Sequence, residues 1–140
     1  MICFFNEDTP FTLTGKKWLV KTQIISLAEM ENKKPGDLCF IFCSDNFLLE
    51  MNKKYLNHDY YTDVITFDYT VDNIISGDIF ISVERVHENA HRFGAPFSHE
   101  LRRVIYHGIL HLCGYMDKSD DEQRTMREKE DFYLKTLPSI

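Results

Sequence analysis

The 140-residue chain is acidic, with 16 Lys and Arg against 22 Asp and Glu, and its formal net charge is −6. Hydrophobic residues make up 44% and aromatic residues 14%, which excludes a disordered or fibrous chain and predicts one globular domain over residues 1–140. The acidic balance also argues against a protein that coats nucleic acid non-specifically, because such proteins normally carry a basic excess.

The N-terminal segment and the cysteines favour a location in the cytoplasm. The opening MICFF is followed by polar and acidic residues, without the basic region of a signal peptide or the run of ~18 apolar residues that a membrane span needs. Cys39 and Cys43 are expected on one strand, where four residues span ~13 Å, which is too far for a disulfide. Together with Cys3 and Cys113 they fit no zinc-finger spacing, so we expect reduced cysteines.

In chain order, the first part of the sequence predicts helices and strands in alternation. Thr14 is expected to cap a first helix, which ends at KKPG, and Ser44 to cap a second. Apolar and β-branched runs predict strands, with a turn at Asp72-Asn73 and Gly77. The expected helices cover residues 15–32 and 45–55, and the expected strands cover residues 37–43, 63–69 and 78–83.

The second part of the sequence predicts three helices, over about residues 83–93, 99–113 and 120–136. Ser98 is the expected cap of the middle helix, and the capping box SDDE opens the last one. Strands early and helices late, without an internal repeat, predict an α+β domain.

The stretch HGILHLCGYMD, which ends the middle helix, has the spacing of a metal site. A helix places residues i and i+4 on one face, so His107 and His111 can present their imidazoles to one ion. Gly114 accepts the left-handed conformation that ends a helix and turns the chain back, which would bring Asp117 in as a third ligand. Two alternatives stay open: buried histidines bonded to carbonyl groups, and an Asp117 that only caps a turn.

A second stretch, HENAHRFGAPF, has the same histidine spacing and predicts an alternative function as a metallopeptidase using His87, Glu88 and His91. Its corresponding third position is Phe97, which cannot bind a metal, and its pattern is typical of an amphipathic surface helix. In the later stretch, Gly108 occupies the place of a peptidase's carboxylate base. A site there would depend on the ion itself, which suits hydrolysis of a charged ester.

HGILHLCGYMD resembles the signature H-G-x-L-H-L-x-G-Y-D-H of the YbeY family. Upstream, MNKKYLNHDYYTDVITF resembles the family block L-N-x-x-Y-R-x-x-D-x-P-T-D-V-L-S-F, and GDIFIS resembles its G-D-I segment. These matches follow one another in the family's order over about residues 48–117. The resemblance implies a zincin-like α+β domain, in which a small mixed sheet is flanked by helices and a central helix carries the metal-binding histidines.

The resemblance also implies a function: a zinc-dependent, single-strand-specific endoribonuclease that matures the 3′ end of 16S ribosomal RNA and takes part in ribosome quality control. It implies one divalent ion per chain, association with the small ribosomal subunit and its assembly factors, and neither a membrane nor DNA as a partner. The implied metal ligands are His107, His111 and Asp117. Candidate residues of the substrate groove, which are equally consistent with strand-edge structure, are Thr62, Asp63 and Thr66.

The chain departs from the family pattern at the third ligand. Asp117 stands where the family has a histidine, and Met116 replaces the adjacent aspartate. Two imidazoles and a carboxylate are still acceptable to zinc. Asp120 and Asp121 could substitute if Asp117 points away.

The second departure is Leu56, where the family usually has an arginine thought to assist at the active site. A leucine cannot bind phosphate, so Arg85, Arg92 or Arg103 would have to supply that charge. The alternative is a ribosome-assembly binding factor with a structural metal, in which catalysis has lapsed.

Overall fold

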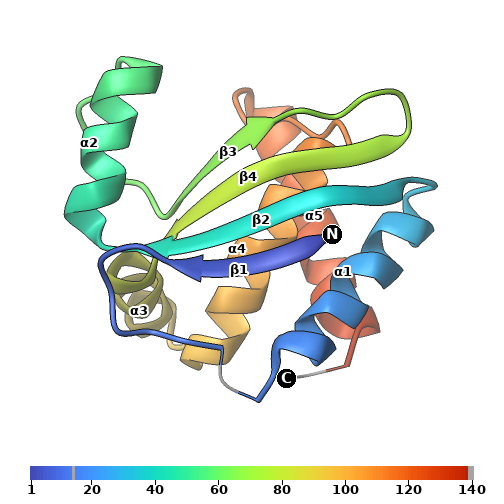
Figure 1. The fold of residues 1–140 in the computed structure, drawn as a ribbon, viewed down its shortest axis with the longest axis horizontal. Coiled ribbons are helices and arrows are strands. Elements are labelled where there is room, and N and C mark those ends of the chain that lie inside the picture. Colours follow the sequence, from blue (N-terminus) through green and yellow to red (C-terminus); the bar gives the residue numbers. More distant parts are fainter. Residues whose placement is uncertain (14, 139–140) are drawn as a thin grey trace.

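The computed structural model describes residues 1–13 and 15–138, which form one mixed sheet and five helices (Figure 1). In chain order the elements are β1 (Ile2–Asn6), α1 (Lys17–Met30), β2 (Lys34–Cys43), α2 (Asp45–Leu56), β3 (Val64–Asp68), β4 (Ile74–Ser82), α3 (Val83–Phe93), α4 (Phe97–Leu112) and α5 (Asp120–Thr136). The strand order is β1-β2-β4-β3, with β3 antiparallel to β4 and the other pairs parallel. The predicted α+β class, with a small mixed sheet, is confirmed.

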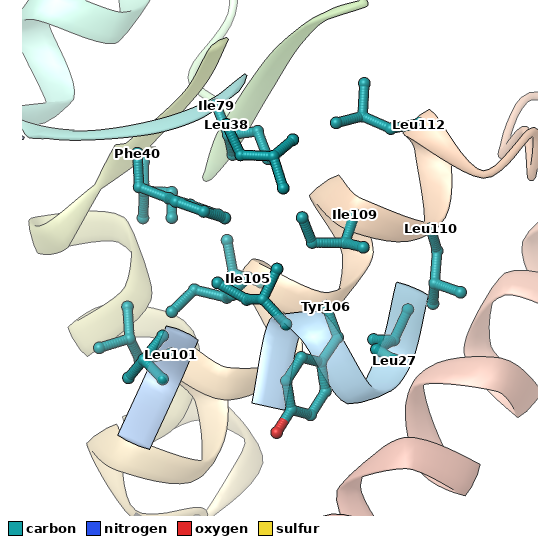
Figure 2. Packing of buried hydrophobic residues seen from close by; sticks show 14 of the residues in the cluster. Leu27, Leu38, Phe40, Ile79, Leu101, Ile105, Tyr106, Ile109, Leu110 and Leu112 are labelled. Atoms are coloured by element: carbon teal, nitrogen blue, oxygen red, sulfur yellow. The ribbon is translucent and has the colours of Figure 1, made fainter. Parts of the chain in front are cut away.

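One face of the sheet carries the main hydrophobic core, which α1, α4 and α5 cover (Figures 1 and 2). Alternate residues of each strand point to the same face, so β2 and β4 each present a row of apolar side chains to α4. Burying each such side chain contributes roughly 1.5–3 kcal/mol. The fully buried members of this core include Leu27, Leu38, Phe40, Ile79, Ile105 and Ile109.

Helix α2 packs on the opposite face, where Leu48 contacts a smaller cluster that contains Ile65 and Cys43. Strand β3 therefore lies between α2 and α4. Ile65 belongs to the cluster under α2, whereas Val64 packs against the main core. The alternation of the strand places Thr66 on the same face as Val64, the face that α4 covers.

Several boundaries differ from the sequence-based expectation. Strand β1 was not predicted, because the short apolar run at the start of the chain has no turn signal before it. Helix α1 ends at Met30, and the chain turns at Asn32, which has a φ of 60°. The expected stop KKPG instead opens β2 from Lys34, and Gly77 lies inside β4.

The helix caps agree in part with the prediction. Ser44 accepts a hydrogen bond from the Phe47 amide, and Ser119 and Glu122 form both halves of the predicted capping box. Helix α4 begins earlier than expected, after Pro96 rather than Ser98, because the Pro96 carbonyl accepts the first hydrogen bonds of the helix. The other predicted cap, Thr14, lies outside the described residues.

The cysteines are free, and Cys39 and Cys43 lie on one strand as predicted. Among the described residues, no helix combines the length and the apolar character needed to cross a bilayer.

Candidate metal centre

Two histidines and an aspartate converge at the C-terminal end of α4. Oδ2 of Asp117 lies 3.2 Å from Nε2 of His107 and 3.3 Å from Nε2 of His111. One potential ligand atom from each residue lies within 4.8 Å of the others. Two imidazole nitrogens and one carboxylate oxygen form a donor set that fits a divalent transition-metal ion such as zinc.

The end of α4 explains how these three side chains meet. His107 and His111 are one helical turn apart, and their rings lie 4.5 Å apart at an angle of 86°. The helix then closes with hydrogen bonds from the amides of Gly114 and Tyr115 to carbonyls of its last turn. Gly114 has a φ of 107°, a value that favours glycine, and the chain there folds back and returns Asp117 to the histidines. The predicted role of Gly114 in the turn is confirmed.

Each histidine is held through its other ring nitrogen. Nδ1 of His107 donates to Oε2 of Glu130 at 2.8 Å, and Nδ1 of His111 donates to the Tyr115 carbonyl at 2.8 Å. With Nδ1 bonded in this way, each Nε2 faces Asp117, and a metal ion would replace the proton that Nε2 of His107 shares with this carboxylate. Such outer contacts orient metal-binding histidines and raise their basicity.

The carboxylates that surround His107 shape the electrostatics of the cluster. Burial acts to lower the pKa of His107, but its hydrogen bonds to Asp117 and Glu130 raise it to about 9. Burial and the charge of His107 lower the pKa of His111. The hydrogen bond from His107 lowers the pKa of Asp117, which keeps this carboxylate ionised. The cluster therefore attracts positive charge, which a proton or a metal ion can supply.

Gly108 allows α4 to lie close to the sheet. A Cβ atom at this position would stand 3.0 Å from two side-chain carbons of Ile79 on β4. Gly108, which stands where a peptidase has its carboxylate base, is therefore also a point of close contact between α4 and β4.

The cluster lies between two hollows of the surface. The larger hollow, of about 870 Å³, extends toward the end of α2, and the smaller one, of about 340 Å³, lies between α3, α4 and α5. His107 and Asp117 line both. The groove candidates Thr62, Asp63 and Thr66 all line the larger hollow, and Asp63 also lines the smaller one.

Two of these groove candidates have unusual surroundings. Burial raises the pKa of the Asp63 carboxyl, whose side chain accepts a hydrogen bond from Asn89 at 3.4 Å. The buried hydroxyl of Thr66 has no hydrogen-bond partner among the described residues. Leu56 and Met116, the two departures from the family pattern, also line the larger hollow.

The earlier histidine stretch forms no comparable cluster. The His87 ring stacks on Phe97 at 3.9 Å, and Glu88 lies 3.5 Å from Arg85. His91 is exposed near the end of α3. Within residues 1–13 and 15–138, only the later stretch gathers three potential metal ligands.

The candidate substitutes are positioned elsewhere. Asp120 and Asp121 are exposed in the first turn of α5. Arg85 pairs with Asp45 at 2.6 Å, and Arg92 is exposed on α3. Arg103 lines the smaller hollow, where it binds Glu130 and Asp131 at 2.9 and 2.8 Å.

Glu130 is the residue of the site that sequence reasoning missed. It lies 23 residues after His107, in a helix rich in acidic residues. A signal was present, because Met126, Glu130 and Tyr133 have the spacing of one helical face and all three are buried. An acidic residue on a buried apolar face needs a partner, which here is His107 together with Arg103.

Comparisons with known proteins identify the family of the chain. The model of the family described as endoribonuclease YbeY matches residues 4–138. Proteins named endoribonuclease YbeY from Flavobacterium psychrophilum and Parabacteroides distasonis are 56% and 50% identical to this chain. The alignments cover 94% and 98% of this chain, and 93% and 96% of theirs. The solution structure of TM1509 from Thermotoga maritima has a TM-score of 0.66 and 31% identity, over 98% of this chain and 89% of that one. The chain belongs to the YbeY endoribonuclease family.

Proposed function

We propose that this chain is a zinc-dependent endoribonuclease acting on single-stranded segments of ribosomal RNA, with His107, His111 and Asp117 as the ligands of one ion. The observation that carries the proposal is the convergence of two Nε2 atoms on one carboxylate oxygen between two surface hollows. The family match over residues 4–138 supports the reaction class.

The residues around the cluster orient the proposed metal ligands. Glu130 and the Tyr115 carbonyl fix the two imidazoles with their Nε2 atoms inward, so the donor set is in place before an ion binds. A bound zinc ion would supply Lewis-acid chemistry, polarising a phosphate oxygen and activating a water molecule. The hollows on both sides leave room for the RNA on either side of the phosphate that is cut.

Asp63 is the carboxyl group best placed to exchange a proton. It lines both hollows beside His107, and burial raises its pKa. A carboxyl group in this place is suited to general acid or base work. Gly108 removes the alternative used by peptidases, because it has no carboxylate.

The test combines metal analysis with an RNA cleavage assay. We expect about one zinc per chain in the purified protein, cleavage of an unstructured ribosomal RNA fragment, and loss of both in His107→Ala. Asp117→Ala should lose much of the zinc. His87→Ala is the matched control, because this exposed histidine lies on α3, outside the cluster.

Other outcomes select other functions. A parent protein that binds zinc but leaves the RNA intact, with a His107→Ala variant that unfolds, would favour the ribosome-assembly factor with a structural metal. Protease activity lost in Glu88→Ala would favour the peptidase. Zinc retained in Asp117→Ala would remove Asp117 from the ligand set.

Four further properties stay predictions of the family resemblance. They are binding to the small ribosomal subunit and its assembly factors, a place in ribosome quality control, cleavage at the 3′ end of 16S ribosomal RNA, and location in the cytoplasm. Co-sedimentation of the protein with small subunits in a sucrose gradient would test the first of them.

A further inference from the structure

An aromatic pair lines the larger hollow, which it shares with the metal cluster. The rings of His58 and Tyr60 stack with centroids 5.0 Å apart and an angle of 22° between their planes, and the Tyr60 hydroxyl lies 2.9 Å from Nδ1 of His58. Both residues are exposed, with Tyr60 at 55%. Both line the hollow that His107 and Asp117 also line.

The loop that carries this pair is held by Asn52 of α2, which is buried. The Asn52 side-chain amide donates to the Tyr60 carbonyl at 2.9 Å, and the Asn52 main-chain carbonyl accepts from the His58 amide at 3.1 Å. Asn57 reverses the chain between them with a φ of 57°. The two rings are thus exposed on a fixed backbone, so ordering them for a ligand costs little entropy.

Charge alone gives this hollow little affinity for RNA. Of the described residues that line it, Lys118 is the only lysine or arginine, whereas Asp63, Asp68 and Asp117 also line it. Leu56 occupies another position on its wall. Stacking of bases on aromatic rings is a source of affinity that needs no positive charge, and it is open only to unpaired bases.

We propose that His58 and Tyr60 form a stacking subsite for an unpaired nucleobase of the RNA, a short distance along the strand from the phosphate at the metal cluster. The inference rests on the proposed function, from which it takes the substrate class. It adds a physical reason for single-strand preference, because a base held in a duplex must first lose its pairing and its stacking on neighbouring bases before it can stack on His58 and Tyr60.

The test uses an unstructured oligoribonucleotide that carries one 2-aminopurine, whose fluorescence falls when it stacks on another ring. We expect the parent protein to bind and quench it. Tyr60→Ala should lose the quenching and bind about 5- to 150-fold more weakly, the range that stacking of a single base provides. Tyr60→Phe keeps the ring and should bind within about twofold of the parent, since stacking needs only the ring.

Tyr69→Ala is the matched control. Tyr69 is 57% exposed but lines a separate hollow beside Asp78, so its loss should change neither quenching nor affinity. The same strand annealed to its complement should bind the parent more weakly and respond little to Tyr60→Ala. The subsite would be overturned if the parent and Tyr60→Ala bound the single strand with equal affinity. It would also be overturned if Tyr60→Ala lost as much affinity for the duplex as for the single strand.

Cleavage is followed by gel in the same samples, which separates the two proposals. If the parent protein quenches the fluorescence but does not cut the RNA, the endoribonuclease proposal is contradicted and the stacking subsite is retained. Cleavage with quenching that Tyr60→Ala does not alter would contradict the subsite alone. A parent that neither binds nor cuts the strand would contradict both.

Discussion

Replacing Glu130 by glutamine should weaken metal binding although no proposed ligand is changed. In the structure, Oε2 of Glu130 accepts from His107, and Oε1 accepts from Arg103 at 2.9 Å and from Arg127 at 3.5 Å. An amide has one acceptor oxygen where the carboxylate has two. Whichever way the glutamine side chain turns, its NH2 group therefore faces a donor, either the His107 ring or the arginines.

The structure sets the size of the effect. The Glu130 side chain is only 6% exposed, so a donor that loses its partner there is not rescued by bulk water. Leaving a buried polar group unsatisfied costs about 1–3 kcal/mol. Loss of an outer partner of a metal-binding histidine typically costs about 10–100-fold in affinity, which is about 1.4–2.7 kcal/mol. The two estimates agree, and we expect zinc affinity to fall by about 10–100-fold.

A competition titration against a chromogenic chelator measures this loss, and thermal unfolding of the metal-free proteins shows whether the fold itself has changed. Asp131→Asn is the control, because it removes the exposed partner of Arg103 and leaves Glu130 intact. A surface pair of this kind contributes about 0–1 kcal/mol, and it is not bonded to His107. The reasoning would be refuted if Glu130→Gln bound zinc as tightly as the parent, or if Asp131→Asn lost as much zinc affinity as Glu130→Gln.

Three further predictions concern stability. Gly77→Ala should destabilise the protein by about 1–3 kcal/mol or more in urea unfolding, because the added Cβ would overlap the Phe67 carbonyl oxygen across the β3–β4 ladder. An unchanged unfolding midpoint would contradict this prediction. Ser119→Ala should cost about 1 kcal/mol in the same assay through the lost cap of α5, and a loss no larger than that of a surface substitution would exclude the cap. Burial acts to raise the pKa of Glu31, but hydrogen bonds from Tyr133, Tyr115 and Lys129 lower it below its ordinary 4.5. Its stabilising effect is therefore present above pH 4.5 and is lost as the pH falls through the lowered value. Urea midpoints measured from about pH 6 to about pH 3 should converge for the parent and Glu31→Gln, and a constant gap would contradict the assignment.

The sequence predicted the parts of the site that are local. His107 and His111 are brought together by helical spacing, and Asp117 is returned by a turn whose glycine is visible in the sequence. The capping box of α5 is local in the same way. Features of this kind depend on a few consecutive residues, so the pattern of residue types contains the information.

Other parts depend on contacts between distant segments. Strand β1 exists because β2 offers it a parallel partner from Leu38 to Phe42, which five residues at the chain start do not indicate. Glu130 acquires its role because α5 packs beside α4. The stacked pair His58 and Tyr60 depends on a buried side chain, Asn52, that binds the backbone of a polar loop. In each case the sequence supplies the group, and the tertiary fold supplies its partner.

The two departures from the YbeY signature act in the same direction. An ion of charge +2 held by two neutral imidazoles and the Asp117 carboxylate keeps a net charge of about +1, whereas a third imidazole would leave about +2. Leucine at position 56 removes a further positive charge from the wall of the same hollow. Because salt weakens RNA binding in proportion to the phosphates that are neutralised, a site with so few cations should bind RNA with a shallow salt dependence. Its affinity must then come from contacts that salt does not screen, which is the kind of contact that the exposed rings of His58 and Tyr60 provide.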